Sequence, residues 1–175
     1  NINEKFADKF LSGFSEGDYI VLQNETNIVP YVINKADEKG MKIILNPSPI
    51  TEDILSFPLE KVDLFILNEV EGEALTGEKD ENKIIDSLLK LYPLAEFVLT
   101  LGAKGAIYFS NKERIEIKAK KVKVVDTTAA GDTFTGYFIA GISNGESVKN
   151  ALRSATEAAG KAVTVLGAAE SIPYM

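Results

Sequence analysis

Short apolar runs alternate along the chain with segments whose apolar residues recur at helical spacing. Lys42–Leu45 and Phe65–Leu67 are nearly continuous apolar stretches, which is typical of parallel strands covered on both faces. Alternation of this kind predicts an α/β fold with a mostly parallel sheet and helices on both faces. The expected strands lie near residues 19–23, 41–46, 63–67 and 97–101, and the expected helices near 3–12, 27–39 and 80–92.

The second half of the chain predicts a hairpin followed by two helices. Residues 105–109 and 113–118 are strand-like runs separated by Ser110-Asn111-Lys112, as in two strands joined by a turn. No internal repeat or linker separates these elements from the first half, so we expect a single α/β domain over residues 1–175. The remaining expected elements are the end of a strand at Val122, Val124 and Val125, and helices at 132–143 and 147–165.

Composition limits the kind of protein this can be. The chain has 175 residues, 45% of them hydrophobic and 26% charged, and about 70% of the unfolded surface can be buried at this size. It has no cysteine, which excludes disulfides and thiolate metal sites. No stretch reads as a signal peptide or a membrane span, so the cytoplasm is the expected location. A net charge of −7 argues against nucleic acid or an anionic membrane as partner.

A turn of small residues, Ala129-Ala130-Gly131, leads to Asp132 at the start of the first C-terminal helix. Helix starts leave free N–H groups and carry partial positive charge, so this turn suits a phosphate. No Lys or Arg lies between Lys123 and Lys149. An anion here would therefore be held by backbone amides, by a neighbouring metal ion or by residues from elsewhere in the chain.

The carboxylate of Asp132 needs a task if an anion binds beside it. The chain has no His and no Cys, so proton abstraction near neutral pH falls to a carboxylate, a Lys or a Tyr. We therefore predict that Asp132 is a general base. The alternative is an ordinary acidic residue that interacts with the helix dipole; the second acid at Asp126 and the small residues before Asp132 favour the catalytic interpretation.

Residues 125–136 are similar to the signature of the ribokinase-like sugar kinases, also called the phosphofructokinase B family. Asn46–Pro49, Asn68–Glu71 and Thr100–Gly105 follow in the order that this family uses. The resemblance covers essentially the whole chain and implies a ribokinase-like, Rossmann-like three-layer sandwich. It corresponds to the later part of such kinases, so the family's N-terminal part and lid would precede Asn1.

The resemblance implies ATP-dependent phosphoryl transfer to a sugar hydroxyl, with free sugars such as ribose favoured. Asp132 would contact the sugar and take the hydroxyl proton. The turn formed by Ala129, Ala130 and Gly131 would stabilise the transferring group through its amides. Glu25, at the end of the first expected strand, would approach the sugar.

Two further segments would bind the cofactor. The family resemblance makes Asn68 and Glu71 residues that order Mg²⁺ and phosphate oxygens, although the same spacing is a simple capping box at a helix start. It also places the loop with Thr100, Gly102, Lys104 and Gly105 along the nucleotide, although this loop could be a plain glycine turn into the hairpin. A Walker A motif is absent, because Gly160-Lys161 is followed by Ala162.

A potassium site is implied near the C-terminal end. By itself, Val163–Pro173 reads as a helix end with a glycine cap and a loop. The resemblance assigns an activating K⁺ to Asp126, Thr128, Ala162, Val165, Gly167 and Ser171.

The expected ligands are thus ATP and a small sugar, and the full-length protein would form a homodimer through its lid. We expect the 175 residues alone to be inactive, because the family's N-terminal region supplies most sugar contacts. Ala155 stands where relatives often carry Asn or His against adenine, which predicts looser adenine binding. Two alternatives stay open: a kinase of another branch, acting on fructose phosphates, nucleosides or vitamin alcohols, and a non-catalytic nucleotide-binding fragment.

Overall fold

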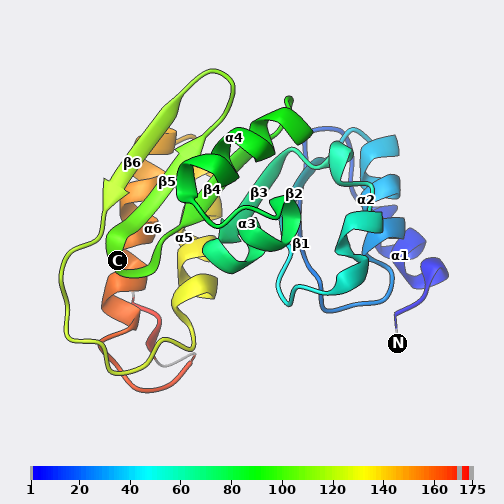
Figure 1. Ribbon diagram of the computed structural model, residues 1–175. Helices are drawn as coiled ribbons and strands as arrows, with labels where there is room; N and C mark the ends of the chain where they lie inside the picture. Colours follow the sequence, from blue (N-terminus) through cyan, green and yellow to red (C-terminus); the bar gives the residue numbers. More distant parts are fainter. Residues whose placement is uncertain (1, 169–170, 174–175) are drawn as a thin grey trace. The chain divides into compact units, whose positions relative to one another are not determined.

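The computed structural model describes residues 2–168 and 171–173. Contacts between residues divide the chain into two compact units (Figure 1). The first unit comprises residues up to Leu99 together with Phe109–Glu113, and the second comprises Thr100–Tyr108 and the residues from Arg114 onward. Both units combine strands with helices, which confirms the predicted α/β class. None of the described helices is long and apolar enough to cross a bilayer.

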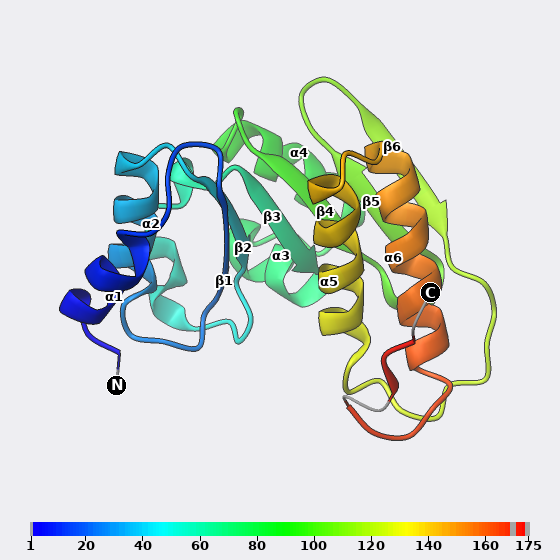
Figure 2. The same cartoon turned by 180° about the vertical axis from the view of Figure 1, so that it is seen from behind.

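The first unit contains four strands in chain order, with helices between them. Its strands lie in the order β1-β2-β3-β4, and Figures 1 and 2 show α3 and α4 together on one side of them. Every predicted strand and helix of this half is found. The elements are α1 (Glu4–Leu11), β1 (Tyr19–Gln23), α2 (Val29–Glu38), β2 (Lys42–Asn46), the 3₁₀ turns η1 (Glu52–Ser56) and η2 (Leu59–Lys61), β3 (Leu64–Asn68), α3 (Glu69–Thr76), α4 (Glu81–Leu91) and β4 (Glu96–Thr100).

Strands β2 and β3 form the core of the first unit. Strand β2 is parallel to β1 and to β3, with Ile44 opposite Leu64 and Leu45 opposite Phe65. Ile43, Ile44 and Leu45 are each at most 1% exposed. Because successive side chains of a strand point to opposite faces, three buried neighbours in a row require both faces to be covered. The interpretation of these apolar runs as central parallel strands is therefore confirmed.

The second unit contains the hairpin and the two long C-terminal helices. Strand β5 is buried along its whole length, whereas exposed and half-buried residues alternate along β6. Figures 1 and 2 show α5 and α6 side by side on one side of this hairpin. The elements are β5 (Gly105–Phe109, of which Phe109 belongs to the first unit), β6 (Arg114–Lys118), α5 (Ala130–Ser143) and α6 (Val148–Ala162), with the 3₁₀ turn η3 (Gly102–Lys104) before β5.

Helices α5 and α6 approach closely through small residues. A Cβ atom added to Gly141 would lie 2.8 Å from the Cβ atom of Ala151 and 3.1 Å from its Cα atom. Ala151, Leu152 and Ala155 of α6 are 0% exposed. These small residues form the packing face of α6, and the contact fixes where α5 lies relative to α6.

The segment between β6 and α5 differs from the prediction. Val122, Val124 and Val125 were expected to end a strand, but the structure has no strand between Lys118 and Ala130, and these valines are 41–56% exposed. The backbone amides of Val125 and Asp126 instead donate to the carbonyl of Val163, at 2.7 and 3.2 Å. This segment is tied to the end of α6, which ends at Ala162 rather than at the predicted 165.

Replacement of Gly141 by Ala should destabilise the second unit. The added methyl group overpacks the α5–α6 contact, at a cost of about 1–3 kcal/mol, and this exceeds the gain of about 1 kcal/mol in helix propensity. Gly136 in the same helix has no atom within 4 Å of an added Cβ, so Gly136→Ala should raise the melting temperature. Thermal unfolding followed by circular dichroism checks both, and an equal effect of the two variants would contradict the packing argument.

Candidate functional site

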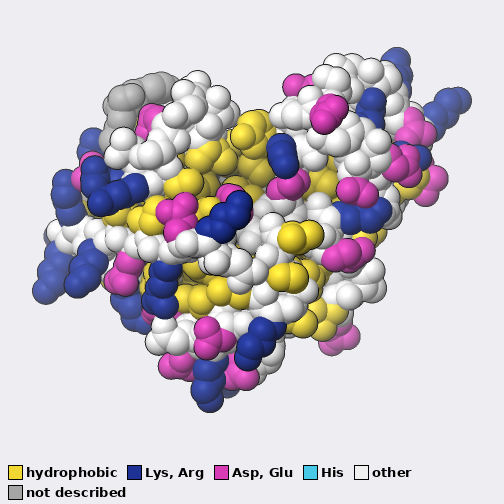
Figure 3. Space-filling model, turned by 90° about the horizontal axis from the view of Figure 1, so that it is seen from above, with side chains coloured by type: hydrophobic (Ala, Val, Ile, Leu, Met, Phe, Trp, Pro, Cys, Tyr) yellow, Lys and Arg dark blue, Asp and Glu magenta, His cyan; other side chains and the backbone are white. Residues whose placement is uncertain are grey.

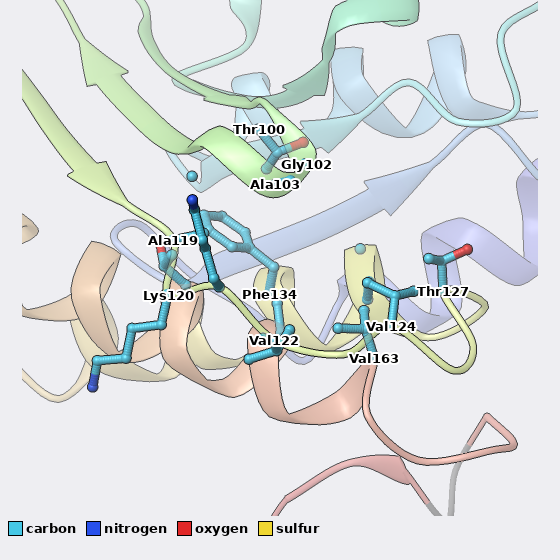
Figure 4. A pocket seen from close by; sticks show the side chains of 17 residues that line it. Thr100, Gly102, Ala103, Ala119, Lys120, Val122, Val124, Thr127, Phe134 and Val163 are labelled. Atoms are coloured by element: carbon cyan, nitrogen blue, oxygen red, sulfur yellow. The ribbon is translucent and has the colours of Figure 1, made fainter.

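One cavity of the second unit unites two of the predicted segments. It has a volume of about 500 Å³ and is lined by Thr100, Gly102 and Gly105 from the loop before β5, and by Ala130 and Gly131 from the start of α5. Figure 4 shows this pocket from close by, with Phe134 between the loop that carries Gly102 and Ala103 and the segment that carries Val122. The remaining lining comes from Ala103, residues 119–122, Val124, Thr127, and Thr156, Ala159, Gly160 and Val163 in and after α6.

The first turn of α5 borders this pocket with its backbone. Ala129 is the N-cap residue, and no side chain caps the helix there. The amide of Ala130 donates to the Thr127 carbonyl at 3.2 Å, and the amide of Thr133 to the Ala129 carbonyl at 2.9 Å. A Cβ atom added to Gly131 would meet nothing within 4 Å, so this glycine leaves open space beside the amides. A turn with this geometry can accept an anion.

Asp132 lies on the exposed side of the same turn. Its neighbours Thr133 and Phe134 are 2% and 4% exposed, so the apolar side of the helix is anchored in the core while Asp132 faces outward. The predicted general base and the predicted anion turn therefore belong to one rigid helix start. The chemistry assigned to Asp132 stays a prediction.

The two glycines at the turn into β5, Gly102 and Gly105, lack a side chain with different structural consequences. Gly105 has φ of 118°, and an added Cβ would lie 2.0 Å from the carbonyl oxygen of Ile117 and 2.7 Å from the nitrogen of Ala119. It is required by the close approach of the chain after β6. Gly102 has φ of 53° and no atom within 4 Å of an added Cβ, so its open side lies against the pocket. Residues 100–105 can thus both turn the chain into the hairpin and lie along a nucleotide.

Residues 119–124 form a wall of the pocket that the sequence did not indicate. Val122 and Val124 were expected to end a strand, whereas this segment runs as a loop past the cavity. In this loop, Lys120 forms an ion pair with Glu157 of α6 at 2.8 Å. The hydrogen bond from Lys120 lowers the pKa of the Glu157 carboxyl below its usual value. The pair joins the loop to α6 at the rim of the pocket.

The acidity of the whole chain hides a basic second unit. By sequence, this unit carries nine Lys and Arg residues against six Asp and Glu residues, a net charge of +3, although the whole chain has −7. Lys120 and Lys121 line the pocket, and Lys118 and Lys123 are close to them in the sequence. In Figure 3, Lys and Arg side chains gather at the left of the view, the side on which Figure 1 shows β6 and α6. The local field therefore favours an anionic ligand.

Asp126 organises the residues predicted to bind potassium. One carboxylate oxygen accepts from the amide and the hydroxyl of Thr128, at 2.9 and 2.5 Å, and the other accepts from the amide of Gly167 at 3.1 Å. These hydrogen bonds, above all the one from the Thr128 hydroxyl, hold the pKa of Asp126 below its usual 3.8. Asp126, Thr128 and Gly167 are thus brought together by the structure.

The other three members of this set are held by different bonds. The amide of Val165 donates to the carbonyl of Ala162 at 3.1 Å, and the Ser171 hydroxyl donates to the carbonyl of Ala168 at 2.7 Å. The parts of the chain that the structure describes contain no group of three or more acidic side chains placed to hold a metal ion. A cation at this place would therefore depend on backbone oxygens together with Asp126.

Asn68 and Glu71 form the capping box that their spacing allows. The Asn68 side chain accepts from the amide of Glu71 at 2.9 Å, and the Glu71 carboxylate accepts from the amide of Asn68 at 2.8 Å and from its side-chain nitrogen at 2.9 Å. Glu71 is 5% exposed. Burial raises its pKa, against the opposing effect of hydrogen bonds from Asn68 and Ser48. This capping box begins α3, and both of its residues belong to the first unit.

Glu25 is exposed after the end of β1. The neighbouring Asn24 ties the ends of β1 and β2 together, since its amide donates to the Ser48 carbonyl and its side chain to the Pro49 carbonyl, each at 2.8 Å. The structure links Glu25 to no other predicted site residue within the first unit.

Ala155, expected near adenine, is 0% exposed and lies outside the pocket lining. The next residue, Thr156, lines the pocket instead, together with Ala159 one turn later. Neither residue could be identified from the sequence, because small residues along one side of a helix are equally typical of helix packing.

Comparisons with known proteins place the chain among sugar kinases. The sequence profile of the pfkB family carbohydrate kinases matches residues 15–175. Ribokinase of Haemophilus influenzae is 34% identical over 183 residues, covering 99% of this chain and 58% of that protein. The solved structure of Arabidopsis thaliana ribokinase complexed with ribose and ATP has a TM-score of 0.76 at 32% identity, covering 89% of this chain and 52% of that one.

A second solved structure, ribokinase from Cryptococcus neoformans var. grubii serotype A in complex with ADP, has a TM-score of 0.80 at 30% identity. It covers 93% of this chain and 60% of that one. The chain thus spans a little over half the length of the relatives it matches. These likenesses confirm the predicted ribokinase-like fold.

Replacement of Asp126 by Asn should destabilise the protein at neutral pH and lose this effect in acid. A folded-state pKa below 3.8 gives stability that is present above the unfolded pKa and is lost as the pH falls through the folded one. The difference in melting temperature between the wild type and Asp126→Asn should therefore shrink below about pH 4. Asp53→Asn, in the exposed turn η1, is the charge control, and a pH-independent difference for Asp126→Asn would contradict this account.

Proposed function

Because the chain belongs to the pfkB family of carbohydrate kinases, we propose that it is the nucleotide-binding and catalytic part of a kinase that transfers the γ-phosphoryl group of ATP to a hydroxyl of a small sugar of the ribose class. The names of the relatives support the sugar, since proteins called ribokinase cover nearly all of this chain. The observation that carries the proposal is the single pocket shared by the loop 100–105 and the uncapped start of α5.

The backbone of α5 supplies the electrostatic part of the mechanism. The amides of Gly131 and Asp132, together with that of Ala130 once it exchanges the Thr127 carbonyl for a phosphoryl oxygen, donate to the phosphoryl group as negative charge shifts during transfer. Because they are fixed in a helix whose other side is packed in the core, they need no reorganisation at the moment of reaction. Phosphoryl transfer depends mainly on such positioning and charge stabilisation.

Asp132 supplies the base. An aspartate in the first turn takes the proton of the attacking hydroxyl while the amides of the same turn hold the transferring group. Its exposed position on the helix start keeps it accessible to a sugar. Glu25 is the second residue that we assign to the sugar.

Asn68 and Glu71 fit an indirect role toward Mg²⁺. Both oxygens of Glu71 already accept hydrogen bonds from Asn68 and one more comes from Ser48, but the carboxylate keeps a remaining lone pair for a metal-bound water. Magnesium usually keeps several waters and takes few protein ligands, so a buried, oriented carboxylate suits it. The ion would neutralise phosphate charge, and this chain's residues would orient its water shell.

Asp126 fits a supporting role for K⁺. Its carboxylate ties Thr128, which precedes the anion turn, to Gly167 in the C-terminal segment. With Ala162, Val165 and Ser171 contributing oxygens, a bound cation would stiffen this connection without touching the sugar.

Replacement of Asp132 by Asn tests the mechanism. In the longest natural chain that contains these 175 residues, transfer from labelled ATP to ribose should fall about 10²–10⁴-fold, the usual contribution of a general base, while the Kd for Mg·ATP stays within about threefold. Normal turnover in Asp132→Asn would contradict the assignment of the base.

The 175 residues alone should release no ADP with ribose or with other sugars and alcohols above the rate without acceptor. Turnover by this chain would contradict the proposed need for the rest of the protein. If the longer chain transferred phosphate to a nucleoside or a fructose phosphate and not to ribose, the kinase proposal would stand and the proposed acceptor would be wrong.

A further inference from the structure

The loop after β2 is fastened at the carboxyl ends of two strands of the first unit. The amide of Ser48 donates to the side chain of Asn46 at 2.9 Å, and the carbonyl of Ser48 accepts from the amide of Asn24 at 2.8 Å. The side-chain nitrogen of Asn24 donates to the Pro49 carbonyl and to the Thr51 hydroxyl, each at 2.8 Å. Because its backbone is held on both sides, Ser48 presents its hydroxyl in a defined direction.

The hydroxyl of Ser48 reaches Glu71. It is hydrogen-bonded to the Glu71 carboxylate, which also accepts from the amide and the side-chain nitrogen of Asn68 at 2.8 and 2.9 Å. An ionised carboxylate has about four lone-pair sites, so three hydrogen bonds leave one direction open. Glu71 is 5% exposed. The carboxylate is therefore held from the ends of β1, β2 and β3 and can accept from one further donor.

The capping box of α3 is complete without Ser48. Asn68 and Glu71 exchange both hydrogen bonds of the box between themselves, so a helix cap requires neither a third bond to Glu71 nor a loop fastened by Asn24. A purely structural role of the Ser48 hydroxyl would be to satisfy a buried charge. Such a role would affect stability, whereas a role in orienting the carboxylate would also affect what Glu71 binds.

We infer that Ser48 is a positioning residue for Mg²⁺: its hydroxyl, directed by Asn24 and Asn46, fixes the carboxylate of Glu71 that orients the water shell of the ion. This inference rests on the proposed function and adds to it a residue of the loop after β2. Loss of a partner of a metal ligand typically costs roughly 10–100-fold in metal affinity. Ser48 acts one hydrogen bond farther from the ion, so its effect should be smaller.

Ser48→Val and Ser48→Thr form a matched pair, because the two new side chains have nearly the same shape and only threonine keeps the hydroxyl. Calorimetric titration of the 175-residue chain with ATP, once with excess Mg²⁺ and once with EDTA, gives the ratio of the two affinities. Ser48→Val should lower this ratio by at least about threefold, with the affinity in EDTA within about twofold of the wild type. Ser48→Thr should keep the wild-type ratio.

Thermal unfolding establishes that both variants fold. An equal loss in the two variants would show that only the size of residue 48 matters. A ratio for Ser48→Val within about threefold of the wild-type ratio would show that the hydroxyl has no part in binding the metal. Either result, or a wild-type ratio near one, would overturn the inference and leave the kinase proposal intact. Absence of ATP binding in both buffers would contradict the proposed function as well.

Asn24→Leu tests whether the fastened loop transmits the effect. It removes the side-chain bonds to Pro49 and Thr51 and should lower the Mg²⁺ ratio in the wild-type background. In the Ser48→Val background it should lower the ratio no further, because residues that act through one contact are not additive. Asn27→Leu, at an exposed position of the same turn, is the control. Additive losses, or an equal loss in Asn27→Leu, would overturn the inference.

Discussion

The packing of α5 on α6 determines where the first turn of α5 lies, and the pocket depends on that turn. Gly141 allows the two helices to meet at Ala151, and Phe134 and Phe138 bury the inner side of α5. At the other end, the amides of Val125 and Asp126 bind the carbonyl of Val163 after α6. A helix start held from both sides can direct its backbone amides at an anion without relying on a side-chain cap, which is the requirement for an anion site built from backbone.

The pocket divides the tasks of binding between backbone and side chains. The α5 amides and the loop with Gly102 offer polar backbone to a phosphate chain, whereas Val122, Val124 and Val163 offer apolar surface to a base. The charges of the chain are also distributed unevenly, since the second unit is basic and the first is strongly acidic. Net charge over a whole chain can therefore conceal a local preference for anions.

The sequence allowed the fold to be predicted wherever burial was continuous or strictly periodic. The apolar runs of β2 and β3 have one physical cause, burial on both faces, and the spacing of Asn68 and Glu71 satisfies a helix cap whatever else the pair binds. The valines at 122, 124 and 125 have two possible explanations, a strand or a loop over a cavity, and hydrogen bonds from Val125 and Asp126 to Val163 decide for the loop. Thr156 and Ala159 were missed because a small residue facing a pocket and one facing a helix look alike in sequence.

The central claim is that the backbone at the start of α5 binds nucleotide phosphate, and calorimetric titration of Mg·ATP in potassium buffer tests it most directly. The wild-type chain should show saturable one-to-one binding. Gly131→Ala, which places a methyl group in the open space beside the amides, should weaken binding by at least about tenfold, whereas Gly136→Ala on the same helix should leave it unchanged. Equal binding by all three proteins, or no binding at millimolar ATP, would contradict the account.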